Sequence, residues 1–159
     1  MEKIYIDFDG VLVDTPKYIK EEISKYGNNK NTFTNIKWDE LLSKCNEICG
    51  NIKWIRKEYN SIDNRNYSIS IITHYYSECE LNNKKRFIRD NIGNIDIIFV
   101  PFYINKSDFV NAQKNLIVDD YKKTIKLWRK KGGIGILYKN YMKLEDLLLD
   151  YIKEDCYGT

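Results

Sequence analysis

The chain has 159 residues, 43% of them hydrophobic and 14% aromatic, which is enough for a globular core without disulfide bonds or a structural metal and argues against disorder. Its net charge of +3 is too small to indicate a nucleic-acid partner. The sequence has no apolar run that spans a bilayer, no signal-peptide pattern and no C-x-x-C pair among its four cysteines. We therefore expect a cytoplasmic protein that binds no membrane.

The N-terminal part combines one strand with a long helical stretch. Residues 3–8 form a continuous apolar run, as in a short strand buried on both faces. Polar residues and turn formers then separate segments in which apolar residues recur at helical spacing. The expected elements are a strand at 3–8, a helix from an N-cap and first-turn proline at Thr15-Pro16 to Gly27, a loop at 28–35, and two helices between 38 and 59 that break at Gly50-Asn51.

After residue 66, strands and helices alternate. The expected strands lie at 68–73, 95–100, 116–118 and 134–138, and the expected helices at 77–91, 107–113, 121–131 and 144–152. Such alternation requires right-handed crossovers and builds a parallel sheet between two layers of helices, so the predicted fold class is a three-layer α/β fold of the Rossmann type. The first gap between strands holds roughly 50 residues, where one crossover helix would suffice. We interpret residues 15–65 as a small helical cap on a core domain of residues 1–14 and 66–159.

Two basic clusters fall within expected helices. They are Lys84-Lys85-Arg86 and Arg129-Lys130-Lys131. Basic residues on a helix usually form a solvated face, or lie near the C-terminus where the helix dipole favours them. We interpret both clusters in this way, and not as contacts to a phosphate backbone.

Polar side chains of a particular kind follow the expected strands. Asp7 and Asp9 end the first strand, Thr73-His74 the second and Asp119-Asp120 the fourth, while Lys106 follows the third after a short loop. In an open parallel sheet, ligands bind outside the carboxyl ends of the strands. We expect these residues to converge on one site, with Lys106 better placed than its rivals Lys114 and Lys122.

This set of groups suits phosphoryl transfer. Carboxylates so close together repel one another unless a cation lies among them, and oxygen ligands without paired thiols suit Mg²⁺. Lys106, the Thr73 hydroxyl and backbone amides would hold a phosphoryl group. One carboxylate of the pair Asp7 and Asp9 would attack phosphorus, and the other would carry the proton. Asp9 must be turned back toward the site at Gly10, because alternate residues of a strand point to opposite faces.

The residues carry a resemblance to the haloacid dehalogenase (HAD) superfamily. The stretch DFDGVLVDT resembles the D-x-D motif I of that superfamily, and Thr73 after SISII resembles motif II. Lys106 resembles motif III, and Asp119-Asp120 after LIV resembles the acidic motif IV. The resemblance covers residues 1–14 and 66–159, and the segment between them lies where the superfamily places its C1 cap. One departure is Lys123, because many relatives carry Asp or Asn four residues after the first motif IV aspartate.

The resemblance implies a role for each matching residue. Asp7 would be the nucleophile and a Mg²⁺ ligand, and Asp9 the general acid and base with its backbone carbonyl on the metal. Thr73 and Lys106 would hold the phosphoryl group, with a backbone N–H from His74. Asp119 would bind the metal, with Asp120 beside it or behind it. Asp14 is expected to brace the loop before the first helix.

The expected activity is Mg²⁺-dependent hydrolysis of a small phosphomonoester. The dehalogenase branch lacks the second aspartate of motif I, so Asp9 favours phosphoryl transfer. The short chain and motif I are most similar to the 5'(3')-deoxyribonucleotidase-like branch, which implies a nucleoside monophosphate substrate. Three alternatives stay open: a regulatory module that binds without turnover, a phosphatase acting on nucleic-acid ends, and a phosphomutase.

Aromatic residues bear on the substrate. Trp38 lies on the apolar stripe of an expected cap helix, where a place in the core of the cap is the simplest interpretation. Phe33 and Tyr75-Tyr76 fall in expected loops near the cleft. They would either stack on a base or pack on the surface, and the sequence favours neither.

Overall fold

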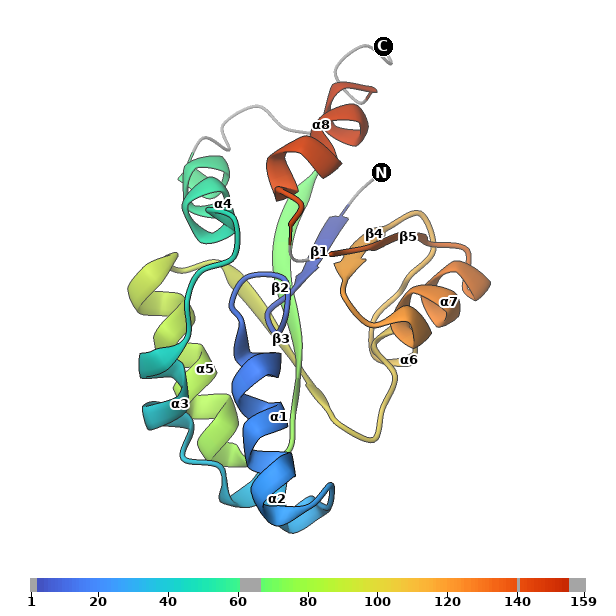
Figure 1. Ribbon diagram of the computed structural model, residues 1–159. Helices are drawn as coiled ribbons and strands as arrows, with labels where there is room; N and C mark the ends of the chain where they lie inside the picture. Colours follow the sequence, from blue (N-terminus) through green and yellow to red (C-terminus); the bar gives the residue numbers. More distant parts are fainter. Residues whose placement is uncertain (1–2, 61–66, 140, 155–159) are drawn as a thin grey trace.

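The computed structural model describes residues 3–60, 67–139 and 141–154, which form five strands and eight helices (Figure 1). The strands are β1 (Lys3–Asp7), β2 (Ser68–Tyr75), β3 (Asp96–Pro101), β4 (Leu116–Asp119) and β5 (Ile134–Leu137). The helices are α1 (Thr15–Tyr26), α2 (Lys30–Asn35), α3 (Trp38–Lys44), α4 (Asn51–Asn60), α5 (Glu78–Asn91), α6 (Lys106–Phe109), α7 (Lys122–Lys130) and α8 (Leu144–Glu154). Within these ranges, no helix has the length and apolar character needed to cross a bilayer.

The strands form one parallel sheet in the order β3-β2-β1-β4-β5. β1 lies at its centre, where Ile6 pairs with Ile71 of β2 on one side and Val118 of β4 on the other. All five carboxyl ends therefore lie along the same edge of the sheet. The α/β fold of the Rossmann type, with a parallel sheet between layers of helices, is confirmed.

The two faces of the sheet bury separate apolar clusters because alternate side chains point to opposite sides. Ile4 and Ile6 of β1 contribute to one cluster, which packs against α3, α4, α5 and α8. Tyr5 contributes to the other, which packs against Ile125 and Trp128 of α7. Figure 1 shows this division, with α1 to α5 on one side of the sheet and α6 and α7 on the other.

The insertion between β1 and β2 contains α1 to α4, and it packs directly on the sheet. Trp38 and Leu41 of α3 and Ile55 of α4 belong to the same buried cluster as Ile4 and Ile6. The helix α3 also lies against α5, the crossover helix that follows β2. The insertion thus shares its core with the sheet, and its division from the rest of the chain as a cap stays a prediction.

Two expectations for this insertion are wrong in detail. The loop expected at residues 28–35 contains α2, because the Asn29 side chain accepts a hydrogen bond from the Thr32 N–H at 3.0 Å and caps the helix. Asp14, and not Thr15, is the N-cap of α1. Thr15 lies in the first turn instead, and its hydroxyl donates a 2.6 Å hydrogen bond to the Asp9 carboxylate.

Asn51, the first residue of α4, fastens three distant segments together. It is only 1% exposed, and its Nδ2 donates to the Val11 carbonyl at 2.9 Å and the Tyr138 hydroxyl at 2.8 Å. Its Oδ1 accepts from the Leu144 N–H at 2.9 Å. The loop after β1, the start of α4 and the start of α8 are therefore joined through one buried amide.

We expect Asn51→Ala to lower the free energy of unfolding by about 2–4 kcal/mol, because it leaves the Val11 carbonyl and the Leu144 N–H buried without this partner. Chemical denaturation of both proteins measures the difference. Asn82→Ala, at an exposed position of α5, is the matched control and should stay within about 0.5 kcal/mol of wild type. An Asn51→Ala protein as stable as this control would contradict a stabilising role for the hydrogen bonds of Asn51.

Candidate active site

The carboxyl ends of β1, β2 and β4 bring the expected polar residues together. Asp7 is the last residue of β1 and Asp119 is the last residue of β4. Thr73 and His74 lie near the end of β2, and Lys106 is the first residue of α6. Neighbouring parallel strands place these side chains side by side, since the order of the sheet sets β1 between β2 and β4.

Lys106 joins two of the carboxylates. Its Nζ lies 2.7 Å from Asp7 Oδ1 and 2.8 Å from Asp119 Oδ2, and all three side chains are buried. Backbone N–H groups complete the arrangement, with Phe8 donating to Asp7 at 2.8 Å and Tyr121 donating to Asp119 at 2.8 Å. The two buried carboxylates hold Lys106 charged, and its pKa is raised although burial alone would lower it.

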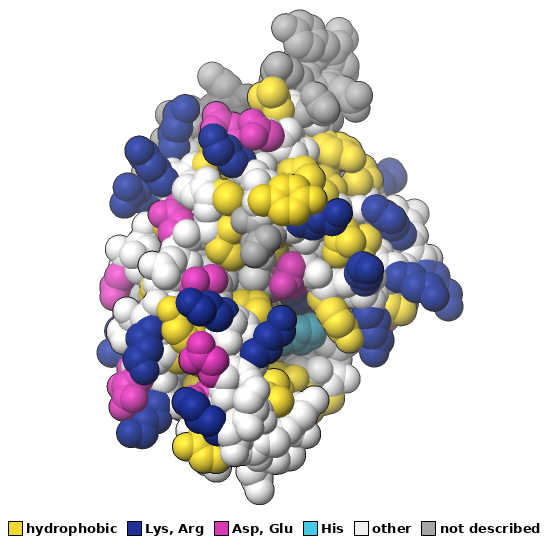
Figure 2. Space-filling view, viewed as in Figure 1, with side chains coloured by type: hydrophobic (Ala, Val, Ile, Leu, Met, Phe, Trp, Pro, Cys, Tyr) yellow, Lys and Arg dark blue, Asp and Glu magenta, His cyan; other side chains and the backbone are white. Residues whose placement is uncertain are grey.

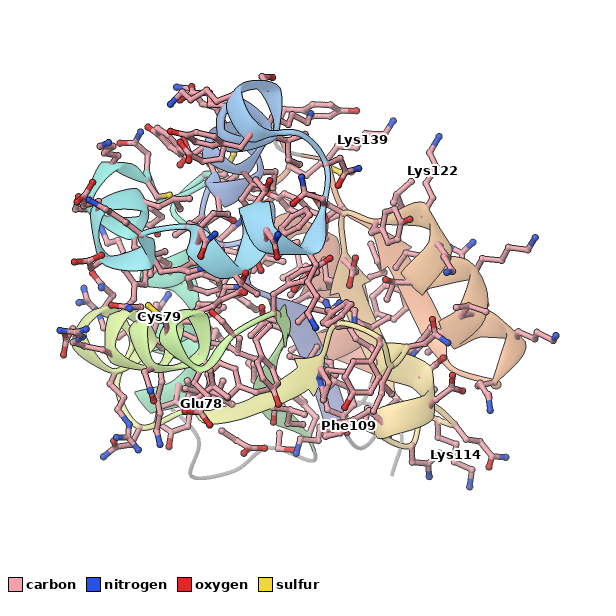
Figure 3. All side chains as sticks on the ribbon, turned by 90° about the horizontal axis from the view of Figure 1, so that it is seen from below. Glu78, Cys79, Phe109, Lys114, Lys122 and Lys139 are labelled. Carbon is pink, nitrogen blue, oxygen red and sulfur yellow. The ribbon has the colours of Figure 1, made fainter. Side chains whose placement is uncertain are left out.

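The rival lysines lie elsewhere. Lys114 and Lys122 are both exposed, and Figure 3 shows each at the outer edge of the molecule with its side chain directed outward. Of the three lysines considered from the sequence, Lys106 is the one that contacts the carboxylates.

Asp7, Asp119 and Asp120 form a cluster that fits a divalent cation. One carboxylate oxygen of each lies within 4.8 Å of the other two. Burial raises the pKa of Asp7 well above its usual value, Lys106 opposes this, and the neighbouring carboxylates add to it. Burial and Asp119 also raise the pKa of Asp120 to about 6. Three hard oxygen donors with this excess of negative charge are the ligand set that Mg²⁺ prefers.

Gly10 allows Asp120 to approach the turn that follows β1. Its φ is +74°, a conformation that favours glycine, and a Cβ at this position would overlap the Asp120 carboxylate. Its N–H donates to the Val13 carbonyl at 2.9 Å, which closes the turn. The expected turn at Gly10 is therefore present, and the missing side chain leaves room for the Asp120 carboxylate beside it.

Asp9 lies in a second set of contacts. Its Oδ1 accepts from the Thr15 hydroxyl at 2.6 Å, and its Oδ2 accepts from the Thr73 hydroxyl at 3.0 Å and from Lys84 Nζ at 2.5 Å. Burial alone would raise the pKa of Asp9, but Lys84 and the two hydroxyl groups lower it below its usual value.

Asp14 has the structural role expected for it in the loop before α1. Its carboxylate accepts a hydrogen bond from the Asn46 N–H at 2.6 Å and so joins this loop to the segment after α3.

Lys84 is the site residue that the sequence reasoning missed. The expectation of a solvated face is wrong here, because Lys84 is 1% exposed and its ammonium pairs with Asp9 and Glu80. The helical spacing contains a usable signal, because Glu80, Lys84 and Ile88 lie four residues apart and form the buried face of α5. Ser77 and Glu80 also have the spacing of a capping box. The Ser77 hydroxyl accepts from the Glu80 N–H, but the Glu80 carboxylate accepts from the Tyr76 N–H, one residue before the N-cap.

His74 has its ring engaged with the backbone. Its Nε2 donates to the Ile104 carbonyl at 2.9 Å, so this bond links the end of β2 to the loop after β3. Burial lowers the pKa of the ring, and the nearby Lys106 lowers it further. The ring is thus engaged within the protein, and the expectation that His74 serves the site through its backbone N–H stays a prediction.

Three aromatic rings stack beside the site. Phe33 of α2 stacks on Tyr76 at 4.4 Å between ring centroids and 12° between planes. Tyr76 stacks in turn on Phe102 at 4.5 Å and 13°. The rings come from the insertion, the loop after β2 and the loop after β3, so they connect α2 to two loops at the carboxyl edge of the sheet. Tyr75 points elsewhere and meets the edge of Phe99.

The sequence matches no family model and no curated protein, but solved structures share its fold. A haloacid dehalogenase-like hydrolase from Streptococcus pneumoniae has a TM-score of 0.55 at 14% identity, over 94% of this chain and 90% of its own. A haloacid dehalogenase-like hydrolase from Xanthomonas campestris has a TM-score of 0.60 at 10% identity, over 100% and 95%.

A HAD family enzyme from Bacteroides thetaiotaomicron, solved in complex with magnesium and inorganic phosphate, has a TM-score of 0.57 at 9% identity, over 92% of this chain and 98% of its own. These identities are low, so the likeness concerns the fold. The chain has the HAD-like fold, as the resemblance of its motifs implies.

We expect Mg²⁺ to raise the melting temperature at about pH 7.5 and to lose this effect toward about pH 5, because protons compete with a metal for carboxylates whose pKa is raised. Asp120, with a pKa of about 6, and Asp7, whose pKa is also raised, are the competing groups. Thermal unfolding with and without Mg²⁺ across this pH series measures the effect. Asp119→Asn should abolish it and Asp146→Asn, at an exposed position of α8, should not. A Mg²⁺ effect of equal size at both pH values would contradict the proposed ligands.

Proposed function

We propose that this protein is a Mg²⁺-dependent hydrolase of small phosphomonoesters that works through a phosphorylated Asp7. The observation that carries the proposal is the contact of the Asp7 carboxylate with Lys106 beside Asp119 and Asp120, with Asp9 two residues further along the chain. A nucleophile, an anion-binding cation, metal ligands and a proton carrier are then all available at one edge of the sheet.

In the first step, the Asp7 carboxylate attacks phosphorus and the bond from phosphorus to the leaving oxygen breaks. Asp9 in its protonated form gives its proton to that oxygen, and the substrate leaves as an alcohol. Lys106 would hold a phosphoryl oxygen in this step. Among the described residues its ammonium meets two carboxylates, and it has three N–H groups, so one remains for the substrate.

In the second step, water attacks the phosphorus of phospho-Asp7. Asp9, now ionised, accepts a proton from the water, and the bond between phosphorus and the Asp7 oxygen breaks to release phosphate. The contacts of Asp9 keep it ionised and able to accept this proton, since the Lys84 ammonium and the hydroxyl groups of Thr15 and Thr73 stabilise its charged form and lower its pKa. The protonated form that the first step uses is therefore the less populated one at neutral pH.

Asp7, Asp119 and Asp120 are the residues that would hold Mg²⁺, with the backbone carbonyl of Asp9 as a further expected ligand. When bound, Mg²⁺ supplies positive charge that keeps Asp7 ionised and offsets the charge of the phosphoryl oxygens. The chain's own contribution is to hold Asp7 and Asp119 in place beside Asp120, through Lys106 and the backbone N–H groups of Phe8 and Tyr121.

The proposed substrate class is nucleoside monophosphates. The stack of Phe33, Tyr76 and Phe102 supports this choice. Its central ring, Tyr76, lies three residues after Thr73 in the chain, and Phe102 at the end of the stack is 38% exposed. A base could extend such a stack, which a sugar ring does less well. The same stack also packs the insertion onto the loops, so both interpretations of these aromatics made from the sequence are compatible with it.

We expect Asp7→Asn to lower the turnover of p-nitrophenyl phosphate by more than about 10³-fold, because the amide is a poor nucleophile and nothing replaces it. Phosphate release at saturating Mg²⁺ measures the loss, and acid quenching with a phosphorus-labelled substrate should trap label on the wild type alone. Asp90→Asn, an exposed aspartate of α5, is the control.

Other outcomes of this experiment favour other functions. Full activity of Asp7→Asn would remove Asp7 as the nucleophile. Tight phosphate binding by the wild type without any turnover would favour a regulatory module. Transfer of the label to a second hydroxyl of a sugar phosphate, in place of release, would favour a phosphomutase.

We expect a nucleoside monophosphate to exceed a sugar phosphate in kcat/KM by about 10-fold, and Phe102→Ala to remove about 5–10-fold from the nucleotide alone, as the loss of one aromatic contact predicts. Steady-state kinetics on both substrates measures this. Phe109→Ala, at a similarly exposed phenylalanine of α6, is the matched control. A faster sugar phosphate would contradict the nucleotide proposal.

A phosphorylated oligonucleotide in the same panel tests the action on nucleic-acid ends. Figure 2 shows Lys and Arg side chains over much of one face, with Asp and Glu among them on the side of α1 to α4. Basic residues on α7 are exposed as well, which is the feature that a nucleic-acid substrate would use. Faster turnover of the oligonucleotide, with a steep loss between low and high salt, would favour that alternative over a small substrate.

A further inference from the structure

Lys84 is surrounded by acceptors on the inner side of α5. Its Nζ lies 2.5 Å from Asp9 Oδ2 and 2.7 Å from Glu80 Oε1. The same atom donates to the His74 carbonyl at 3.0 Å and to the Thr73 hydroxyl oxygen at 3.2 Å. With its surface 1% exposed, this lysine is as buried as the apolar residues of the core.

The number of these acceptors distinguishes Lys84 from Lys106. An ammonium group has three N–H donors, and Lys84 has four acceptors within 3.2 Å, so its donors are already used within the protein. Lys106 meets two carboxylates among the described residues and keeps one donor. Lys84 is therefore suited to holding protein groups in place, and Lys106 to binding a phosphoryl oxygen.

The surroundings of Lys84 keep it from moving. The Trp38 ring lies 4.8 Å and the Phe8 ring 5.6 Å from its Nζ, which places the cation between two aromatic faces. Trp38 meets Lys84 through its ring face, and its buried N–H has no hydrogen-bond partner among the described residues. Glu80 is fixed in turn, because its Oε2 accepts from the Tyr76 N–H at 2.8 Å.

We propose that Lys84 is a positioning residue, which orients the Asp9 carboxylate for the reaction, directly and through the Thr73 hydroxyl, from its place between Glu80 and Trp38. The proposal rests on the proposed function, because Asp9 must carry a proton for its orientation to affect the rate. Without Lys84, Asp9 keeps only hydroxyl partners and can rotate about its χ1 away from the leaving oxygen. Misplacement of this kind lowers kcat and leaves phosphate binding through Lys106 intact.

A double-mutant cycle on kcat with an alkyl phosphomonoester such as glycerol phosphate tests this proposal, because its alkoxide leaving group needs a proton, whereas p-nitrophenolate leaves readily without one. Lys84→Met should lower kcat by about 100-fold, as expected for the loss of general acid–base catalysis, with KM within about 2-fold of wild type. In the Asp9→Asn background, the same substitution should lower kcat by less than about 3-fold, because Lys84 acts through Asp9. Lys85→Met, the same change at the next position of α5, is the matched control.

A second variant covers the case in which Lys84→Met fails to fold, because it leaves Glu80 and Asp9 buried without their cation. Glu80→Gln combined with Lys84→Met removes the buried charge of Glu80 and keeps an oxygen for the Tyr76 N–H. Circular dichroism and thermal unfolding check its fold. The expected result is the same loss of kcat with KM unchanged.

The remaining outcomes separate the two proposals. If the wild-type protein is active and the folded Glu80→Gln/Lys84→Met variant has the same kcat, the role of Lys84 is overturned and the proposed function is not. Equal losses of kcat on Lys84→Met in the wild-type and Asp9→Asn backgrounds would also overturn it, because they indicate a structural role. A 10-fold rise in the KM of Lys84→Met would overturn it too, because it indicates phosphate binding. If the wild-type protein shows no turnover, or turnover that Asp7→Asn leaves unchanged, the proposed function and the role of Lys84 are overturned together.

Discussion

Buried charge at the carboxyl edge of the sheet is the constraint on which the rest of the site depends. Two ammonium groups lie there, and each is held between two carboxylates: Lys106 between Asp7 and Asp119, and Lys84 between Asp9 and Glu80. Taking such groups out of water is costly unless their geometry is good and further hydrogen bonds complete it. The crossover helices α5 and α6 meet this requirement, because each carries one of the two cations.

The sequence predicts the sheet and one of the two buried charge clusters, the one around Lys106. Parallel strands end at one edge, so Asp7 and Asp119 can be placed together from the strand pattern alone. For Lys84 the helical spacing predicts only a common face with Glu80 and Ile88. What that face packs against is a tertiary contact that local propensity does not encode, so the partners of Lys84 could not be predicted. The helix α2 escapes prediction for a local reason, since a six-residue helix capped by Asn29 has almost no apolar periodicity.

The insertion contributes to the site in two places, through its side chains rather than through a motif. Thr15 reaches Asp9 from the start of α1, and Trp38 covers Lys84 from the start of α3. Both contacts involve Asp9 or Lys84, and neither involves Lys106. A change in the packing of α3 would therefore affect Asp9 first, while Asp7 and Asp119 keep their own supports in β1 and β4.

The buried amide of Asn51 has a consequence for protein engineering. It ties the turn after β1 to α4 and α8, and the insertion shares one apolar cluster with the sheet. The insertion is thus unsuited to being exchanged as a module. Its removal would expose the apolar side chains on one face of the sheet and leave the Val11 carbonyl and the Leu144 N–H without their partner Asn51. If the stack of Phe33, Tyr76 and Phe102 contacts the substrate as proposed, a change of specificity would be made by point substitutions in this stack, with the helices behind it left in place.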